Sequence, residues 1–390
     1  LPTEAVYEHE PPHATQTRAQ KLAAVREAMT KHRATDHLVS SVDDVAWITN
    51  LRGADVTYNP VFLAHLLITQ TEATLFVGAG KIPAALIARL AADGIALAPY
   101  EQAGAALAAL GSGSTLLVDP KRVAFGVCQR AGSGCVVKEA INPSTLLKSR
   151  KTPEEAAFIR ESMVEDGVAM CEFYSWFEAA LARGERLTEL TVDERLSAAR
   201  ARRPGFMGLS FGTIAGFNAN GAMPHYRATE ASHAPIEGDG LLLIDSGGQY
   251  LGGTTDITRT WAIGTPDAAI KRDYTLVLKG AMQLSRARFP RGTPSPMLDA
   301  LARAPLWQHG IDYGHGTGHG VGYFLNVHEG PQSIGKAVPD PTMAMEPGMI
   351  TSIEPGLYRV GQWGVRIENL VLSVPAATPA APTAPSPRPP

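Results

Sequence analysis

The sequence is poor in cysteine and in long hydrophobic runs, and each shortage excludes a class of protein. Its three cysteines, Cys128, Cys135 and Cys171, include no Cys-x-x-Cys pair. A disulfide framework or a cysteine zinc site is therefore not expected. Apolar runs such as 241–244 are far too short to cross a bilayer, and no apolar leader segment opens the chain. These features predict a cytoplasmic protein without a membrane partner.

An excess of charge of one sign is also missing. The formal net charge is -3 at pH 7, which gives no electrostatic reason to expect nucleic acid as a partner. The paired glycines at 247–248 and 252–253 form neither a dinucleotide-binding fingerprint nor a Walker loop. What remains is the composition of an ordinary globular protein, with 45% hydrophobic and 19% charged residues.

The 390 residues divide into two regions of different character and a tail. Residues 1–148 alternate strand-like and helical segments, which predicts an α/β domain. A basic, polar link at 148–151 leads to Thr152-Pro153-Glu154-Glu155, a typical helix start. Residues 149–375 begin with that helix and continue into glycine-rich strands, which predicts an α+β domain. Residues 376–390 are rich in alanine and proline and are predicted to be disordered.

The segment from Gly310 to Gly322 carries two histidines, His315 and His319, among five alternating glycines. So many glycines exclude a helix and indicate backbone that lies close to another group. A histidine held there is typical of a metal or catalytic site. A glycine-rich surface loop is an equally good interpretation when the segment is considered alone.

The sequence spacing of four carboxylates predicts that they face each other in pairs across two β-hairpins. A hairpin turning at 250–251 would place Asp245 opposite Asp256, and a second hairpin would place Glu354 opposite Glu368. Like charges that face each other destabilise a pair of strands. A positive charge is therefore expected between the members of each pair.

Two carboxylate pairs and one glycine-framed histidine suit two divalent ions held close together. This chemistry favours Mn²⁺ or Co²⁺, with Zn²⁺ as a further option. Four buried carboxylates could not all stay ionised without such ions. For any one of these acids alone, a place on the surface at a strand end is the better interpretation, and only the two pairings together favour the metal site.

The order and context of five residues resemble the dinuclear metal ligands of the pita-bread metallopeptidases, which include methionine aminopeptidase, prolidase and aminopeptidase P. These five residues are Asp245, Asp256, His319, Glu354 and Glu368. The finer motifs at 244–247, 315–322 and 324–331 are similar to the Xaa-Pro aminopeptidase (aminopeptidase P) group, in its larger, eukaryotic-cytosolic-like form. The resemblance extends over nearly the whole chain up to Val374.

The resemblance implies an α+β pita-bread catalytic domain preceded by a creatinase-like α/β domain, without the first domain of the larger members. It also implies release of the N-terminal residue from peptides with proline second, by a hydroxide bridging two divalent metal ions, with Mn²⁺ as the first choice. A prolidase acting on dipeptides and a pita-bread protein that binds without catalysis are the alternatives. A homodimer is retained as a candidate assembly.

The resemblance further implies roles for three histidines and one ligand. His225 and His328 are expected to contact the substrate and take part in catalysis, and His315 to line the proline pocket. Glu354 is expected to bind metal and also to carry a proton to the leaving proline nitrogen, which is a tertiary amide. Without the family pattern, a lone histidine such as His225 would be interpreted as structural.

Two further residues are expected to support the ligands. Arg366 lies two positions before Glu368, so it either points to the opposite edge or pairs with a ligand carboxylate. Balancing charge behind the ligands is the use we favour, because metal ligands need orienting partners. Tyr358 is a candidate hydrogen-bond donor in the same layer.

Overall fold

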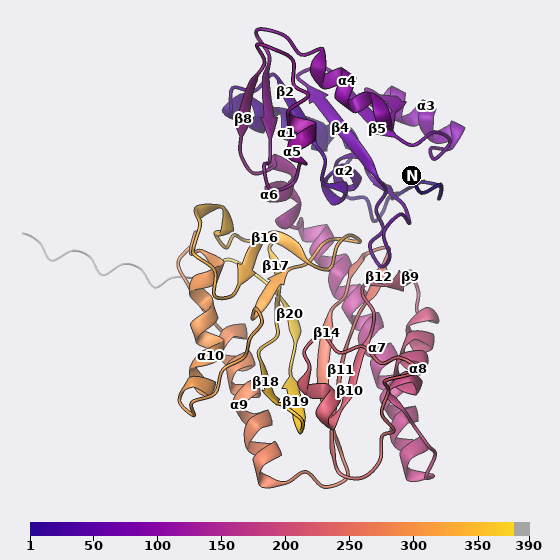
Figure 1. Ribbon diagram of the computed structural model, residues 1–390, viewed down its shortest axis with the longest axis vertical. Coiled ribbons are helices and arrows are strands. Elements are labelled where there is room, and N and C mark those ends of the chain that lie inside the picture. The colour runs from indigo at the N-terminus through magenta and orange to yellow at the C-terminus, as the bar shows by residue number, and fades with distance from the viewer. Residues whose placement is uncertain (378–390) are drawn as a thin grey trace, which may run out of the picture.

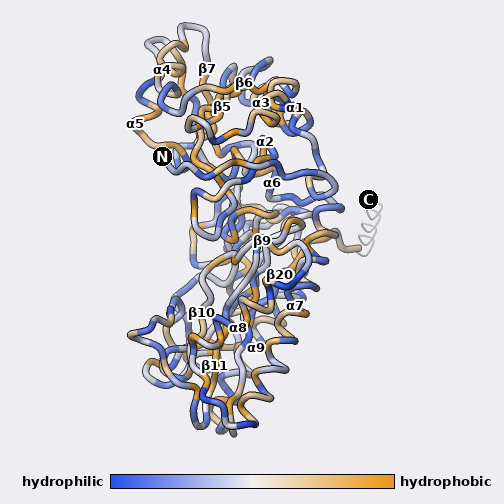
Figure 2. The backbone as a smooth tube through the Cα atoms, turned by 90° about the vertical axis from the view of Figure 1, so that its right-hand side faces the viewer, coloured by the Kyte–Doolittle hydropathy of each residue, from blue (hydrophilic) through white to orange (hydrophobic). Residues whose placement is uncertain are grey.

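The computed structural model describes residues 1–377 and shows two regions stacked end to end (Figure 1). The predicted tail, 376–390, lies almost entirely outside the described residues. Among those residues, no helix is both long enough and apolar enough to span a membrane. Blue and orange alternate along the long helices in Figure 2, because each helix has one buried and one solvent-facing side.

The N-terminal region is built around a six-stranded mixed sheet with the order β6-β5-β4-β2-β7-β8. The β2–β7, β7–β8 and β5–β6 pairs are parallel, whereas β4 runs antiparallel to both β2 and β5. The strands are β2 (Asp36–Val39), β4 (Ala64–Thr69), β5 (Ala73–Val77), β6 (Ile95–Pro99), β7 (Thr115–Val118) and β8 (Val136–Glu139). The helices are α1 (Arg18–Lys31), α2 (Val42–Thr49), α3 (Ala84–Ala92), α4 (Ala103–Ala108), α5 (Phe125–Cys128) and α6 (Pro143–Ser149).

Both faces of this sheet are buried. Successive side chains of a strand point to opposite faces, so Leu38 and Val39 of β2 enter two different hydrophobic clusters. The first cluster joins the sheet to α1 and α2, and the second joins it to α4 and α5. The predicted α/β character of the region follows from this helix–sheet–helix layering.

The C-terminal region places two helix pairs outside a set of antiparallel strands (Figure 1). The helices are α7 (Pro153–Ala182) with α8 (Glu189–Ala201) on one side, and α9 (Ala268–Ser285) with α10 (Asp299–Trp307) on the other. The strands of the first half are β9 (Phe206–Leu209), β10 (Ile214–Phe217), β11 (Gly240–Ser246), β12 (Gly248–Tyr250), β13 (Gly253–Thr254) and β14 (Ile257–Ile263). Those of the second half are β15 (Gly318–Gly320), β16 (Glu329–Ile334), β17 (Ile350–Ile353), β18 (Gly356–Arg359), β19 (Trp363–Arg366) and β20 (Asn369–Leu372).

Strand β11 illustrates how the sequence directs side chains toward the centre of this region. Leu242 and Ile244 pack into the cluster formed with α7 and α8, whereas Leu241 packs with residues of the second half. Because side chains alternate along a strand, Asp245 lies on the same face as Leu241. The carboxylate that ends this apolar strand therefore faces the other half of the domain.

Three expectations from the sequence were wrong in detail. One strand was expected over 210–216, but only 214–216 are extended, as part of β10, and 210–213 form the loop after β9; the strand expected over 364–373 is divided into β19 and β20. The basic, polar stretch at 148–151 is not a separate link, because Lys148 belongs to α6 and its side chain is 2% exposed. Its positive charge is matched by the buried acids Asp43 and Glu329.

Buried polar contacts join the two regions. Lys148 and Lys151 each lie 2.7 Å from a carboxylate oxygen of Glu329, at the start of β16. The buried Arg52 donates hydrogen bonds to the backbone carbonyls of Tyr323 and Phe324, at 3.2 and 2.7 Å. The loop between β15 and β16 is therefore held at both ends by groups from the N-terminal side of the chain.

A buried ion pair between α7 and α8 supports a first prediction about stability. Arg200 donates to both oxygens of Asp166 at 2.6 and 3.0 Å, and both side chains are at most 1% exposed. Arg200→Met should lower the free energy of unfolding by about 3–5 kcal/mol, because it leaves a buried carboxylate without its partner. Urea denaturation of the purified protein measures this change.

Arg202 provides the matched control for that experiment. It pairs with Glu172, but the two side chains are 56% and 47% exposed. Arg202→Met should cost only about 0–1 kcal/mol, because solvent screens such a pair. Equal losses in the two variants would contradict the role assigned to the buried pair.

Candidate metal centre

The five predicted ligands come from strand ends in both halves of the C-terminal region. Asp245 lies near the end of β11, Asp256 lies between β13 and β14, and His319 is the middle residue of β15. Glu354 follows β17 directly, and Glu368 directly precedes β20. Five separate segments of the chain thus deliver oxygen and nitrogen donors to one place.

The pairing expected for the first two acids was wrong by two residues. Strand β11 pairs with β14 so that Asp245 lies opposite Thr258, and β12 and β13 keep the same register around the turn. Asp256 is therefore a diagonal neighbour of Asp245 instead of its direct partner. A shift of two residues leaves both side chains on one face of the sheet, because the side-chain period of a strand is two.

The pairing of the other two acids, Glu354 and Glu368, agrees with the hairpin predicted from their spacing. Ile353 lies opposite Asn369, and Gly356 lies opposite Arg366. The β17–β20 and β18–β19 pairs have the same register, and this register places Glu354 across from Glu368. The two acids therefore face each other between these two strand pairs, where the backbone turns from β17 into β18.

The donor atoms converge on His319. Its Nε2 atom lies 3.4 Å from Asp256 Oδ2 and 3.3 Å from Glu354 Oε1. Ligand atoms of Asp256, His319 and Glu368 all lie within 4.8 Å of one another. Asp245 Oδ1 and Glu368 Oε1 are buried and have no hydrogen-bond partner among the described residues.

Crowding changes the proton affinities of these groups. Burial, with the charge of Asp245 adding to it, raises the pKa of Asp256 to about 7 despite the hydrogen bond to His319. Burial also raises the pKa of Glu368 well above its usual value. For His319, burial favours the neutral ring, but hydrogen bonds to Asp256 and Glu354 outweigh it and raise the pKa to about 10. The protein groups alone thus retain protons at neutral pH to limit the repulsion.

Arg366 supports the centre from behind. Its guanidinium donates to Asp245 Oδ2 at 2.7 and 3.2 Å, to the Tyr358 hydroxyl at 2.7 Å and to the carbonyl of Pro224 at 3.3 Å. Tyr358 is in turn 2.7 Å from His315 Nε2. The buried guanidinium of Arg366 therefore orients the carboxylate of Asp245. Through Tyr358 and Pro224 it also contacts the two segments that carry His315 and His225.

The glycines on either side of His319 have a steric reason. A Cβ atom at Gly318 would lie 2.0 Å from the carbonyl oxygen of Ser352, and one at Gly320 would lie 2.0 Å from that of Glu329. Strand β15 is therefore squeezed between β17 and β16, and only glycine fits beside the histidine. By contrast, Gly314 has no atom within 4 Å of its Cβ position.

A cavity of about 640 Å³ opens over these groups. The exposed rings of His225 and His328 and the half-buried ring of His315 line it, together with four of the five predicted ligands. His328 packs edge-on against His319, with ring centroids 4.3 Å apart. Glu368 lies beneath the cavity surface, at 1% exposure.

Several residues at the site were not identified from the sequence. Thr258 donates a 2.6 Å hydrogen bond to Glu368 Oε2, and Ser352 donates one to Glu354 Oε1 at 3.2 Å. Phe211 and Arg227 line the cavity. Thr258 and Ser352 could have been noticed because each lies two residues from a predicted ligand, Asp256 or Glu354, whereas Phe211 and Arg227 carry no signal without the tertiary structure.

The residues present fit divalent cations. Four carboxylates and one imidazole nitrogen are the donors that Mn²⁺ and related ions accept. The two orphaned oxygens, Asp245 Oδ1 and Glu368 Oε1, are buried acceptors that a cation would satisfy. A cation would also supply the positive charge that the crowded carboxylates require.

Metal affinity should therefore depend on these acids and on pH. Asp256→Asn and Glu368→Gln should each weaken Mn²⁺ binding by at least about 100-fold, whereas Asp340→Asn, at an exposed acid, should not. Binding should release protons and strengthen as pH rises through about 7, because the metal-bound forms of Asp256 and His319 are deprotonated. Isothermal titration calorimetry in buffers of different ionisation enthalpy measures both effects, and pH-independent binding without proton release would contradict them.

Comparison with known proteins supports the same interpretation. The model of the metallopeptidase family M24 matches residues 157–374, and the model of the creatinase/prolidase N-terminal domain matches residues 1–155. The first match alone covers more than half of the chain. It contains all five predicted ligands.

Individual relatives are similar over nearly the whole chain. Probable Xaa-Pro aminopeptidases P of Neosartorya fischeri and Laccaria bicolor are 38% and 39% identical, over 95% and 97% of this chain. The chain spans only 58% and 59% of the length of these two curated relatives. The chain is also similar to the crystal structure of X-prolyl aminopeptidase from Caenorhabditis elegans, described as a cytosolic enzyme with a di-nuclear active site. The two are 31% identical with a TM-score of 0.91, and the match covers 96% of this chain and 62% of that one. The chain therefore belongs to the metallopeptidase family M24.

Proposed function

We propose that this protein is a metal-dependent Xaa-Pro aminopeptidase, which removes the N-terminal residue from peptides with proline in second position. The observation that carries the proposal is the convergence of Asp245, Asp256, His319, Glu354 and Glu368 at the base of a cavity lined by three further histidines. Relatives named as Xaa-Pro aminopeptidases support the substrate class. Because the chain spans only 58% and 59% of the length of two of these relatives, the activity in their names is a proposal for this chain.

Two divalent ions at this centre would supply an activated water and polarise the scissile carbonyl. Mn²⁺ is the ion we expect, with Co²⁺ and Zn²⁺ as alternatives. The neighbour from Caenorhabditis elegans, with its di-nuclear active site, supports two ions instead of one. Its description as cytosolic supports a cytoplasmic location, and a homodimer remains the proposed assembly.

Glu354 is suited to transfer the proton. Burial disfavours its charge, but the hydrogen bond and charge of His319 outweigh burial and lower the pKa of Glu354. An ionised carboxylate can accept a proton from the attacking water and deliver it to the proline nitrogen. That nitrogen must be protonated before it leaves, because it is a tertiary amide without an N–H group.

The histidines at the cavity wall are suited to bind the peptide. The ring of His328 is exposed to the cavity, but partial burial by the surrounding protein and the positive charge of a protonated His319 lower the pKa of His328 to about 4, so its ring is neutral at pH 7. A neutral imidazole N–H can donate to the carbonyl oxygen as negative charge develops there. Burial lowers the pKa of His315, whose ring lies 4.9 Å from that of Tyr313 and offers an uncharged wall to the proline ring. His225 lies at the mouth of the same cavity.

A panel of matched peptides tests the substrate class. With Mn²⁺ present, Xaa-Pro-Yaa tripeptides should be cleaved efficiently, whereas Xaa-Ala-Yaa tripeptides should not. Cleavage confined to Xaa-Pro dipeptides would identify a prolidase instead. Metal binding without cleavage of any peptide in the panel would indicate a non-catalytic binding protein, and equal cleavage of the alanine peptides would refute the proline requirement.

His328→Ala tests the proposed contact with the carbonyl. We expect kcat for a Xaa-Pro-Yaa peptide to fall by about 100-fold, which is typical for loss of one donor to a developing oxyanion. Calorimetric Mn²⁺ affinity should stay within about twofold, because the ring of His328 is outside the ligand set. His309→Ala, which removes a histidine after α10, is the matched control and should leave both quantities unchanged. A parallel loss of metal affinity in His328→Ala would show that the residue acts through the metal centre.

A further inference from the structure

A second cavity, of about 510 Å³, lies where the two regions meet. Its wall comes mainly from the N-terminal region, through the start of α2, the loop containing Asn59 and the turn after β7. Asn326 contributes from the C-terminal region. None of the residues that line this cavity takes part in the metal centre.

Two loops connect this cavity to the catalytic one. Asn326 lines the second cavity and His328, two residues on, lines the first. Asn59 lines the second cavity, and its neighbour Tyr58 accepts a 3.4 Å hydrogen bond from Arg227, which lines the first. The two cavities have no lining residue in common, but these two loops connect them, so one extended ligand can reach from one cavity to the other.

The second cavity carries two cations that form no close ion pair. Lys121 and Arg122 are exposed, and no carboxylate of the described residues lies within 4.0 Å of either. The acid in this cavity, Asp43, is paired with Lys148, whose Nζ lies 2.9 Å from its carboxylate, and the charge of Arg122 acts on it from a longer distance. Helix α2 begins in the same wall, and Asp43 and Asp44 in its first turn offset the partial positive charge of its N-terminal N–H groups.

Arg122 is close to the loop that reaches the metal centre. Its Nη2 atom lies 3.8 Å from the Cβ position of Gly330, two residues after His328. The side-chain oxygen Oδ1 of Asn59 is buried in the same area and has no partner among the described residues. The cavity therefore offers a cation for a carboxylate and an acceptor for a peptide N–H group.

We propose that this cavity binds the C-terminal carboxylate of peptide substrates longer than a tripeptide, with Arg122 as the main cation and Lys121 beside it. The inference rests on the proposed aminopeptidase function, because it needs the N-terminus of the peptide at the metal centre. An extended peptide advances roughly 3.3 Å per residue. A peptide with several residues after its proline reaches from one cavity to the next, whereas a tripeptide ends in the first.

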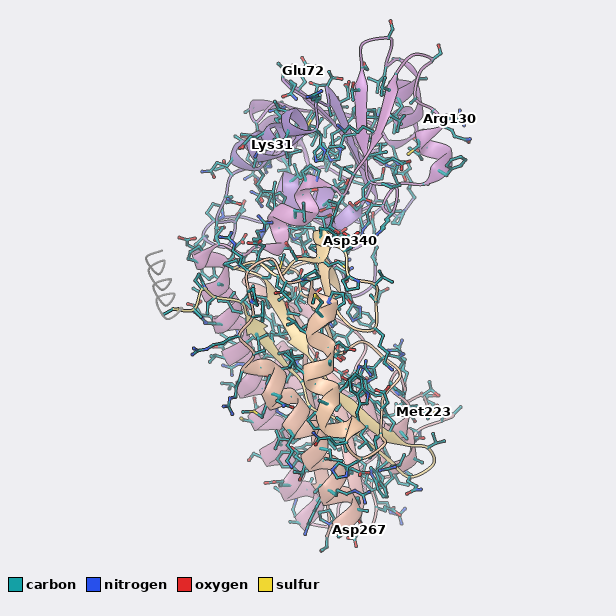
Figure 3. All side chains as sticks on the ribbon, turned by 90° about the vertical axis from the view of Figure 1, so that its left-hand side faces the viewer. Lys31, Glu72, Arg130, Met223, Asp267 and Asp340 are labelled. Carbon is teal, nitrogen blue, oxygen red and sulfur yellow. The ribbon has the colours of Figure 1, made fainter. Side chains whose placement is uncertain are left out.

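Figure 3 labels Arg130 of the N-terminal region above Asp340 of the C-terminal region, and neither residue lines the second cavity. The negative charge of Asp340 interacts with Lys121. Arg122 faces the charge of Asp43 in the same way, and it is the better residue to test because its guanidinium lies 3.8 Å from the Cβ position of Gly330, beside the loop that reaches the metal centre.

The test compares peptides that differ only in length and in their C-terminal group. Xaa-Pro tripeptides and heptapeptides are prepared with a free carboxylate or an amide, and kcat and KM are measured on the metal-loaded protein. For the heptapeptide, KM should be about fivefold lower with the carboxylate than with the amide, the size expected of a solvent-exposed charge pair. This preference should weaken as the salt concentration rises.

Arg122→Met should remove the heptapeptide preference and leave the tripeptide kinetics unchanged. Arg130→Met is the matched control, because Arg130 is also exposed in the N-terminal region but does not line the cavity. A heptapeptide carboxylate preference that survives in Arg122→Met, or is absent from the unmodified protein, would refute the proposal. If an acidic side chain near the end of an amidated peptide restores the full preference, the site binds carboxylates in general, and the assignment to the C-terminus is wrong. Failure to cleave even the tripeptide would instead contradict the proposed function.

Discussion

The centre of this protein depends on one constraint: four carboxylates are crowded around a single imidazole in a largely buried space. Such an arrangement is unfavourable unless positive charge is close by. Arg366 supplies part of it by binding Asp245, and a protonated His319 supplies more. The remaining unmatched oxygens of Asp245 and Glu368 are the places where divalent cations would complete the balance. The crowding that would destabilise the protein alone is what makes the site a metal centre.

The same constraint explains why the support of the site is spread so widely. Arg366 also binds Tyr358 and the backbone of Pro224, which connects the ligands to the stretches carrying His315 and His225. The loop carrying His328 is held from the other side, by Arg52 at its start and by Lys148 and Lys151 at its end. The N-terminal region thus belongs to the architecture of the proposed active site, since its groups fix the loop that forms one wall of the cavity over the predicted ligands. The second cavity extends this wall toward Arg122.

The fold could be predicted well where the sequence pattern is local. The capping pattern at Thr152 predicted the start of α7, and the apolar run before Asp245 predicted β11. Predictions failed where a tertiary contact gives a residue an environment that its residue type alone does not indicate. The stretch that begins at Lys148 was interpreted as a basic, polar link, yet Lys148 ends up in a helix and is buried against Asp43 and Glu329. Composition cannot distinguish these cases, since the partner acids lie more than a hundred residues away along the chain.

The sequence by itself determined which atoms are available to the site: the four carboxylates, the glycine-framed His319, and the symmetric spacing that pairs Glu354 with Glu368. It also determined why glycine flanks His319, although the steric reason appears only with β16 and β17 in place. The tertiary structure alone decided the register that makes Asp256 a diagonal neighbour of Asp245, the seating of Arg366 behind Asp245, and the junction of the two cavities. The physical reason is that spacing limits which residues can share a face of a strand, whereas register and contacts between distant segments depend on how the whole chain packs.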